Sequence, residues 1–436
     1  MRIWLILWSL LWSCTLPLIV LYLWWRGQKD PKYFIKLAER FGRYQKPLSN
    51  TIWIHAVSLG ELRSAVPLIQ TFLSNGEKVV TTHFTPAGRN EAEKVFAVEI
   101  AQGQIQVVWV PFELAFAYRS FFNAFQPKFG LVMEAEIWPR MVFAARAAKK
   151  PLFMCNAQYS NDAFMRDNSG LRIRQKIMRK FSGAMVKSNL KADRFKSIGV
   201  RNIVVTGELR FDQPVPIAQI EAGLAARRWI GAVDRRVITI ASAIEHEDEV
   251  YIKAIQALNE HHIEQDLKPP LFVYVPRRPE RFETVTATLI DAQLDVLTRT
   301  NLWTDLDQTQ WKDAPDCPNI IVGDSLGEMN FYLSMCDDVI IGGGFNPKGA
   351  HNISEALVLG KPVLTGPHVK TIEYPFAEAQ NAGVASSVQD AAALAKALIR
   401  NQHPSASDIQ RFIQEHSNAT SRTLAAIPQL LKATRF

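Results

Sequence analysis

Apolar residues follow two patterns along this chain: one long run at its start and many short runs after it. Residues 3–25 are apolar, or small and polar, without a break. A helix needs about 20 such residues to cross a bilayer. A cleaved signal peptide is the alternative, but only Arg2 precedes the run and no small-residue cleavage site follows it. The pattern therefore predicts an uncleaved membrane anchor over residues 1–25.

Basic residues crowd the segment directly after the predicted anchor. They are Arg26, Lys29, Lys32, Lys36, Arg40 and Arg43, against the acidic residues Asp30 and Glu39. By the positive-inside rule such a flank lies on the cytoplasmic side, and it attracts anionic headgroups. We therefore expect a single-helix anchor with an anionic membrane surface as its partner. Pro17, in the middle of the run, leaves open whether the helix spans the bilayer or lies in one leaflet.

Beyond residue 50, short continuous apolar runs alternate with helical stretches, as in parallel sheets covered by helices on both faces. Strands are predicted at 51–57, 78–84, 105–112, 129–136, 151–157, 183–188 and 202–208, and again at 237–242, 270–277, 295–299, 319–324, 338–343, 361–366 and 383–388. A proline-containing break at 213–217 separates the two series. The alternation predicts an α/β fold with two Rossmann-like, doubly wound domains that face each other across a cleft. The predicted division is anchor 1–25, first domain 26–215, linker 216–230 and second domain 231–436.

Composition narrows the class of protein further. The 436 residues include 50 Lys and Arg against 42 Asp and Glu, and 48% are hydrophobic, which excludes a disordered chain. The four cysteines have no paired spacing, so neither a disulfide framework nor a cysteine zinc site is expected. Basic charge outside the anchor flank is dispersed, and no basic–aromatic motif occurs, so no nucleic-acid partner is expected.

Glu61 is the first candidate for chemistry. The strand at 51–57 leads through Ser58 and Gly60 into a predicted helix, and the carboxyl edge of a doubly wound sheet is where ligands bind. Gly60 permits a close approach of the backbone, and the helix dipole favours an ionised Glu61 that can accept a proton. The alternative is structural, because Ser58 and Glu61 form the S-x-x-E pattern of a capping box. Spacing alone leaves both roles open.

Other strand ends carry polar groups at the same kind of edge. Glu134 and Glu136 end the strand at 129–136, beside Trp138, as a candidate polar pair. In the second half, a glycine turn at 342–344 leads toward a helix that starts near Ser354, and such a turn can present backbone N–H groups to an anion. An empty tight turn is the alternative. Asp305 and Asp307 form a DxD pair in a polar loop without a flanking strand, so we do not expect a metal there.

Taken together, these segments resemble the bacterial 3-deoxy-D-manno-octulosonic acid (Kdo) transferases. The blocks are WIHAVSLGE at 53–61, MEAEIWP at 133–139, GELRFD at 207–212, VPR at 275–277, PERF at 279–282, GDSLGEM at 323–329, and HN at 351–352 with Glu355 before GKPV at 360–363. They keep the family's order, and with the anchor they cover essentially the whole chain.

The resemblance implies a GT-B fold and an inverting, metal-independent transfer of Kdo from CMP-Kdo to a lipid A precursor at the cytoplasmic face of the inner membrane, without a cofactor. It places the general base at Glu61, beside Ser58 and Gly60 on the acceptor side. It also implies that Arg210 and one of Glu134 and Glu136 stabilise the transition state. The implied contacts to CMP are Pro276, Arg277, Gly327, Glu328, Met329, Asn352, Ile353, Ser354 and Glu355.

The chain also departs from the family pattern. Arg210 stands where the family has a lysine, and Gln158 replaces the first residue of the usual Arg-Leu-Ser segment. Further departures are Ala243 and Ile244 for threonine and histidine, Arg278 for histidine, Ala350 for glycine and Ile353 for proline. Three alternatives therefore stay open: another nucleotide-activated sugar or glycolipid acceptor, a nucleotide-sugar 2-epimerase, and an inactive anchored binding protein. The number of sugars transferred, the acylation of the acceptor and the oligomeric state are not predicted.

Overall fold

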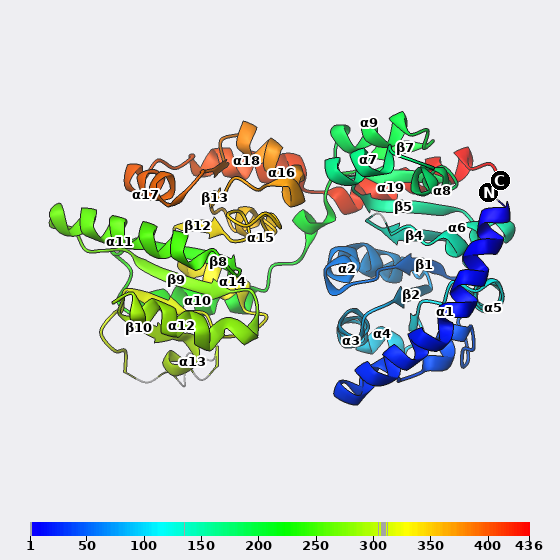
Figure 1. Cartoon of the computed structure of the whole chain (residues 1–436), viewed down its shortest axis with the longest axis horizontal. Helices are drawn as coiled ribbons and strands as arrows, with labels where there is room; N and C mark the ends of the chain where they lie inside the picture. Colours follow the sequence, from blue (N-terminus) through cyan, green and yellow to red (C-terminus); the bar gives the residue numbers. More distant parts are fainter. Residues whose placement is uncertain (1, 135, 304, 307–310, 312) are drawn as a thin grey trace. The chain divides into compact units, whose positions relative to one another are not determined.

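The computed structural model describes residues 2–134, 136–303, 305–306, 311 and 313–436. The chain folds into two units, and each is an α/β layer structure (Figure 1). The first unit contains residues 1–213 and 417–436, and the second contains residues 214–416. Each unit has one seven-stranded parallel sheet. The predicted α/β class with two doubly wound, Rossmann-like sheets is confirmed.

The first sheet has the strand order β3-β2-β1-β4-β5-β6-β7. Its strands are β1 Ile52–His55, β2 Val79–His83, β3 Ile105–Trp109, β4 Phe129–Met133, β5 Leu152–Ala157, β6 Gly183–Val186 and β7 Ile203–Val205. The order reverses between β1 and β4, which pair in register with Ile52 opposite Phe129. In a doubly wound sheet this reversal opens a binding crevice at the carboxyl ends of the two strands.

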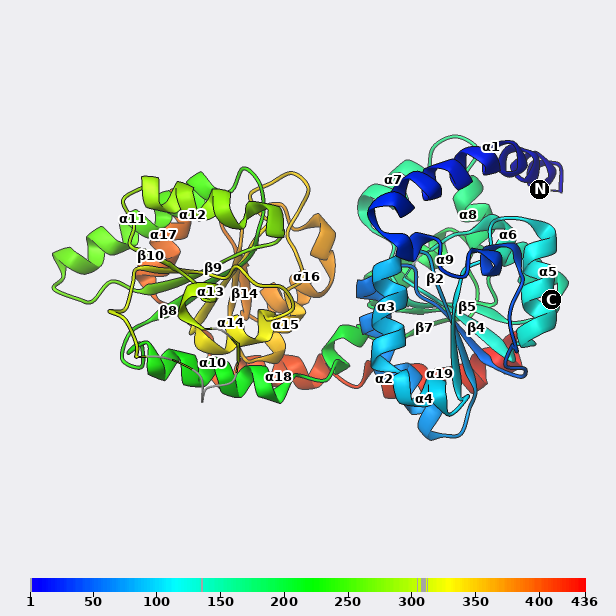
Figure 2. The same ribbon diagram turned by 90° about the horizontal axis from the view of Figure 1, so that it is seen from below.

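Helices cover both faces of the first sheet, and each face has its own core. They are α1 Arg2–Lys29, α2 Leu59–Ser74, α3 Pro86–Val95, α4 Ala97–Ala101, α5 Ala115–Phe125, α6 Pro139–Ala147, α7 Asn161–Asp167, α8 Ile173–Met178, α9 Asn189–Ser197 and α19 Ala419–Ala433. Ile52 and Ile54 of β1 pack with α2 and α19, whereas Trp53 packs with α5 and α6. Figure 2 shows α2 and α3 on one side of the strands and α5 and α6 on the other. Both faces are thus apolar, as the continuous runs predicted.

Helix α1 lies along the outside of the first unit in both views (Figures 1 and 2). By length and apolar composition it is the one described helix that could cross a membrane. One face of α1 packs on the unit: Trp12, Leu16, Ile19 and Leu23 contact Phe112, Leu114 and Ala117. The other face leaves large apolar side chains more than half exposed, among them Ile6, Leu7, Leu10, Leu11, Leu18 and Leu21. The helix is thus apolar on both faces, but only one face is covered by protein.

The second sheet has the order β10-β11-β9-β8-β12-β13-β14. Its strands are β8 Val237–Ala243, β9 Leu271–Pro276, β10 Val296–Thr298, β11 Ile320–Val322, β12 Asp338–Ile341, β13 Val363–Thr365 and β14 Ala385–Ser387. Its helices are α10 Ile217–Trp229, α11 Asp248–Glu264, α12 Phe282–Asp291, α13 Arg299–Leu302, α14 Met329–Met335, α15 Ser354–Val358, α16 Glu373–Asn381, α17 Ala391–Arg400 and α18 Ala406–His416. Each of the fourteen predicted runs therefore contains one strand.

The structure divides the chain differently from the predicted domain boundaries. Residues 216–230 are not a free linker: they form α10, whose buried Gly223 lies so close to Phe331 and Ser334 of α14 that a Cβ would not fit. The end of the chain does not belong to the second unit either. Helix α19 returns to the first sheet, because its small and apolar face fills the core beside α2. Asp212 fixes the start of this return by accepting hydrogen bonds from the backbone of Asn418 and Thr420.

Candidate active site

Glu61 lies in the first turn of α2, directly after β1. One carboxylate oxygen accepts a hydrogen bond from the backbone N–H of Val57 at 2.7 Å, and the other accepts one from the Ser58 hydroxyl at 3.2 Å. The Ser58 oxygen in turn accepts from the Glu61 N–H at 3.4 Å, so the capping box is present. Capping does not exclude acid–base chemistry. Burial, together with the charges of Glu134 and Glu136, raises the pKa of Glu61 to about 7. This carboxyl group can exchange a proton at neutral pH.

Glu134 follows β4, the strand next to β1, and is held in an unusual backbone conformation. Its φ of 56° is in the left-handed region, which a residue with a Cβ adopts at a cost. Its backbone N–H donates to the Cys155 carbonyl at 2.8 Å, and its carboxylate accepts from Gln158 at 2.9 Å and from Arg210 at 3.3 Å. Two neighbouring segments, the end of β5 and the segment of Arg210, thus hold the side chain.

Glu136 has different contacts from Glu134. Its carboxylate accepts from the indole N–H of Trp138 at 3.0 Å, and the Trp138 ring lies edge-on to His55 and Phe84. Arg210 therefore has an ion pair with Glu134 at 3.3 Å, while Glu136 is tied to Trp138. Of the predicted pair, Glu134 is the carboxylate that pairs with the cation.

Arg210 lies in the short helix η3 Leu209–Asp212 after β7. Its guanidinium contacts Glu134 and lies beside Gly60, next to Glu61. A Cβ on Gly60 would lie 4.0 Å from the Arg210 guanidinium, an ordinary contact distance, so Arg210 lies next to the turn that carries Glu61. The structure thus brings together Ser58, Gly60, Glu61, Glu134 and Arg210, which lie far apart in the sequence.

Lys187 and Glu208 form a buried ion pair beneath these residues, which the sequence analysis missed. Both side chains are 2% exposed, and the Lys187 amine lies 2.7 Å from Glu208 and 3.6 Å from Glu134. Burial acts to raise the pKa of Glu208, but Lys187 and Arg210, with a hydrogen bond from Asn156, outweigh it and lower the pKa. A lysine in the otherwise apolar run 183–188 was the available signal. We call Glu61, Glu134, Lys187, Glu208 and Arg210 the charged cluster.

Arg277 opens the candidate site of the second unit, where it follows buried Pro276 at the end of β9. Its guanidinium donates to Nδ1 of His351 at 2.5 Å. Burial and the charge of Arg277 lower the pKa of His351 to about 4, so the imidazole is neutral at neutral pH. Arg277 itself is exposed.

The sequence left two interpretations open for the glycine turn at 342–344, an anion-binding turn and an empty tight turn. Its N–H groups are not free for an outside anion, because the fully buried carboxylate of Glu247 occupies the turn. Glu247 accepts from the backbone N–H groups of Gly343 at 2.7 Å, Phe345 at 2.9 Å and Ile244 at 3.1 Å. The turn therefore binds a carboxylate of the protein itself, from a residue about a hundred positions earlier in the chain. Nothing in the sequence around the turn indicated this partner.

The remaining predicted nucleotide contacts fall into two groups. Asn352 and Glu355 have accessible side chains joined at 3.4 Å, whereas the side chains of Ile353 and Ser354 are buried. Glu328 is held by Arg299 at 2.9 and 3.0 Å, between Gly327, which has a φ of 81°, and Met329 at the start of α14. Among the described residues, the accessible polar side chains of this predicted set are those of Arg277, Asn352, Glu355 and Glu328. Asp307 of the DxD pair lies outside the described residues.

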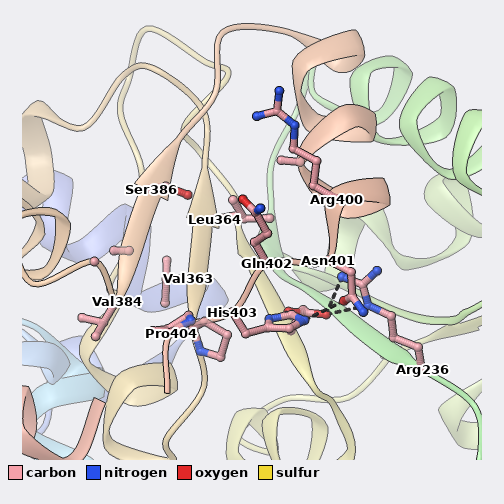
Figure 3. A pocket seen from close by; sticks show the side chains of 15 residues that line it. Arg236, Val363, Leu364, Val384, Ser386, Arg400, Asn401, Gln402, His403 and Pro404 are labelled. Carbon is pink, nitrogen blue, oxygen red and sulfur yellow. Dashed lines mark hydrogen bonds and ion pairs between the residues drawn. The ribbon is translucent and has the colours of Figure 1, made fainter. Parts of the chain in front are cut away.

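A cavity of about 190 Å³ lies elsewhere in the second unit (Figure 3). Arg236 precedes β8 and Asp338 begins β12, so the cavity is at the amino edge of the sheet, opposite the predicted nucleotide contacts. Its polar groups already satisfy one another: Asp338 accepts from Arg236 at 2.8 Å and lies 2.9 Å from His403. This cavity is separate from the candidate site.

Comparisons with known proteins bear on the class of chemistry. A family model described as 3-deoxy-D-manno-octulosonic-acid transferase (kdotransferase) matches residues 36–213. The 3-deoxy-D-manno-octulosonic acid transferase of Bordetella pertussis is 34% identical over 426 residues, which cover 95% of this chain and 96% of that protein.

Two solved structures share the architecture at 13% identity. One is a glycosyltransferase from Rickettsia africae, with a TM-score of 0.57 over 88% of this chain and 99% of that chain. The other is the UDP-GlcNAc 2-epimerase of Neisseria meningitidis bound to UDP-GlcNAc, with a TM-score of 0.54 over 87% of this chain and all of that chain. A transferase and an epimerase thus have this fold in common, so the fold by itself does not decide the reaction.

Proposed function

The chain belongs to the 3-deoxy-D-manno-octulosonic acid (Kdo) transferase family, and on that premise we propose that it moves Kdo from CMP-Kdo to a lipid A precursor. It is a glycosyltransferase of lipopolysaccharide biosynthesis. The proposal adds the lipid acceptor, inversion at the anomeric carbon and independence of metal ions. The observation that carries it is Glu61, a buried carboxyl group at a switch-point strand end whose pKa is about 7.

In the proposed reaction, a hydroxyl group of the acceptor attacks the anomeric carbon of Kdo while Glu61 accepts its proton. The new glycosidic bond forms as the bond from the anomeric carbon to the CMP phosphate oxygen breaks, and CMP leaves as the phosphate monoester. Arg210, paired with Glu134, supplies positive charge next to Gly60 and Glu61. Such a group stabilises negative charge that develops in the transition state.

The donor is proposed to bind at the carboxyl edge of the second sheet. Arg277 suits the CMP phosphate, because an exposed guanidinium forms charge-assisted hydrogen bonds to phosphate oxygens. Glu355 and Asn352 have accessible polar groups for the ribose hydroxyls. Phosphate recognition therefore rests on side chains, since Glu247 fills the glycine turn. This arrangement needs no metal to neutralise the leaving group.

We also propose that α1 lies in one leaflet at the cytoplasmic face of the inner membrane. One face of α1 is covered by the first unit along much of its length, and the other presents exposed leucines and isoleucines. In this position the free apolar face enters the acyl region while the other face stays on the protein, and the basic flank attracts anionic headgroups. A spanning helix would instead leave the protein surface.

The experiment is to incubate the full-length protein in detergent with CMP-Kdo and a tetraacylated lipid A precursor, without added metal and with a chelator. CMP release and the mass of the lipid are measured. We expect a mass increase of one or more Kdo units. Glu61→Gln should lower the rate about 10³-fold, the scale of a lost general base. Glu91→Gln, which alters an exposed ion pair with Arg63, is the matched control and should retain the rate.

The other outcomes separate the alternatives. CMP release without lipid modification would support the donor and contradict the acceptor. Nucleotide binding with no turnover, equal in wild type and Glu61→Gln, would identify a binding protein and contradict the proposal. Conversion of a nucleotide sugar to its 2-epimer would favour the epimerase. The epimerase alternative gives no role to α1 or its basic flank.

A further inference from the structure

Glu113 is a buried carboxylate that the proposed reaction does not use. It lies in the loop between β3 and α5, at the carboxyl edge of the first sheet, and is 1% exposed. Its oxygens accept hydrogen bonds from the backbone N–H groups of Arg140 at 2.8 Å and Met141 at 3.2 Å, at the start of α6. These are N–H groups that a helix leaves without an internal partner, so Glu113 caps α6 from a distant segment.

The third hydrogen bond to Glu113 comes from α1. The indole N–H of Trp8 donates to the same carboxylate oxygen as Arg140, at 2.9 Å. Arg140 adds a return contact, because its guanidinium donates to the Leu5 carbonyl at 3.3 Å and to the Ser9 hydroxyl. Helix α1 is therefore joined to the start of α6 by polar bonds on two sides, in addition to its apolar contacts.

The start of α6 is also the end of the segment that carries the candidate acidic residues. Trp138 is the N-cap residue of α6, and its indole N–H holds Glu136 at 3.0 Å. Trp138 also packs edge-on against His55, two residues before Val57, whose N–H holds Glu61. A shift of the α6 terminus would move these contacts together.

We propose that α1 contributes to the acceptor side of the active site. Through Trp8 and Glu113 it positions the segment that carries Glu134 and Glu136. Glu113 is a positioning residue and Trp8 is its partner on the membrane helix. This inference rests on the proposed function, because it assigns the positioned segment to the transfer of sugar onto a lipid. It predicts that the membrane helix affects turnover as well as attachment.

The physical reason lies in the cost of a buried carboxylate. Glu113 keeps its charge in an apolar site only while donors surround it, and burial already raises its pKa despite three donors. When the Trp8 donor is lost, that oxygen keeps one donor, the Arg140 N–H, where it had two, so the buried charge is less well stabilised and the surrounding segment must relax around it. The segment expected to move is the start of α6, because the Arg140 N–H donates to the same Glu113 oxygen as Trp8.

The test compares two tryptophans of the same helix. Trp8→Phe removes the indole N–H and keeps an aromatic ring, whereas Trp12→Phe alters a ring that packs on Phe112. Both full-length variants are assayed with CMP-Kdo and the lipid A precursor, with membrane sedimentation and Tm as parallel readouts. We expect Trp8→Phe to lower kcat about 5- to 10-fold with an unchanged KM for CMP-Kdo, and Trp12→Phe to stay within about 2-fold. Sedimentation with membranes should be equal.

A second variant tests the coupling itself. Glu113→Gln should lower kcat to a similar extent, and the Trp8→Phe/Glu113→Gln pair should be no slower than the slower single variant, because both remove the same link. Equal kcat for Trp8→Phe and Trp12→Phe, or additive losses in the pair, would overturn the inference while leaving the proposed function intact. A wild-type protein that does not modify the lipid would instead overturn the proposed function.

Discussion

The carboxyl edges of the two sheets are built in opposite ways. At the first edge, the charged cluster comes from four strand ends, and Glu134, Lys187, Glu208 and Arg210 form ion pairs with one another. At the second edge, the one buried acid, Glu247, is satisfied by backbone N–H groups, and the nearby cation Arg277 is left exposed. A cluster that is complete without a ligand is suited to holding a proton acceptor in place. An edge with an exposed cation is suited to recognising an anion.

The buried pair Lys187–Glu208 should show the largest effect. Lys187→Met removes the near counter-ion of buried Glu208 and leaves only Arg210, at 4.0 Å, so we expect a loss of about 3–5 kcal/mol in the free energy of unfolding. Urea denaturation followed by circular dichroism measures it. The double variant Lys187→Met/Glu208→Gln removes the stranded charge and should recover most of the loss. If the double variant is as unstable as the single one, the charge is not the cause.

Ionisation of Glu61 should change stability and activity in opposite directions as the pH rises: the free energy of unfolding falls and the activity increases. Its pKa is about 7 in the folded protein against an ordinary 4.5, so the unfolded chain gives up this proton first as the pH rises. The wild type therefore loses up to about 3 kcal/mol between these pH values. Glu61→Gln removes this loss and keeps an acceptor for the Val57 N–H. We expect the variant to unfold at higher urea than the wild type at pH 8, with a smaller difference at pH 5.

The activity of the wild type should change in the opposite direction over the same range. Only the ionised carboxyl group accepts a proton, so kcat should fall toward tenfold per pH unit below about pH 7. A rate that stays flat from pH 8 to pH 5.5 would remove Glu61 from the role of base.

Arg277 should show the smallest effect of the three and tests the second edge. Arg277→Ala removes charge-assisted hydrogen bonds to the CMP phosphate, and we expect the KM for CMP-Kdo to rise about 10- to 100-fold. The matched control is Arg278→Ala, because Arg278 pairs with Glu245 at 3.2 Å in an exposed position. That variant should stay within about 2-fold, as exposed ion pairs contribute little. Equal effects of the two variants would contradict the assignment of Arg277 to the phosphate.

The glycine turn shows the limit of a local pattern. The sequence Gly342–Gly344 before a helix is compatible with an anion-binding turn or an empty tight turn, and the structure has the protein's own Glu247 there. Lys187 shows the converse, since a charged residue in an apolar run becomes informative only when its partners Glu208 and Glu134 are known. In both cases the partner lies in the segment that follows another strand.

By itself, the sequence determined the fourteen strands, the α/β class and the apolar helix at the start of the chain, because these depend on the local periodicity of apolar residues. It also indicated Glu61 and the pair Glu134 and Glu136 at strand ends, whereas Arg210 came only from the resemblance to the family. Only the tertiary structure decided that α19 returns to the first sheet, that Glu134 rather than Glu136 pairs with Arg210, and that α1 contacts the start of α6 through Glu113. Those facts depend on which distant segments pack together in the interior. A buried polar group there costs free energy unless another segment forms a hydrogen bond or ion pair with it.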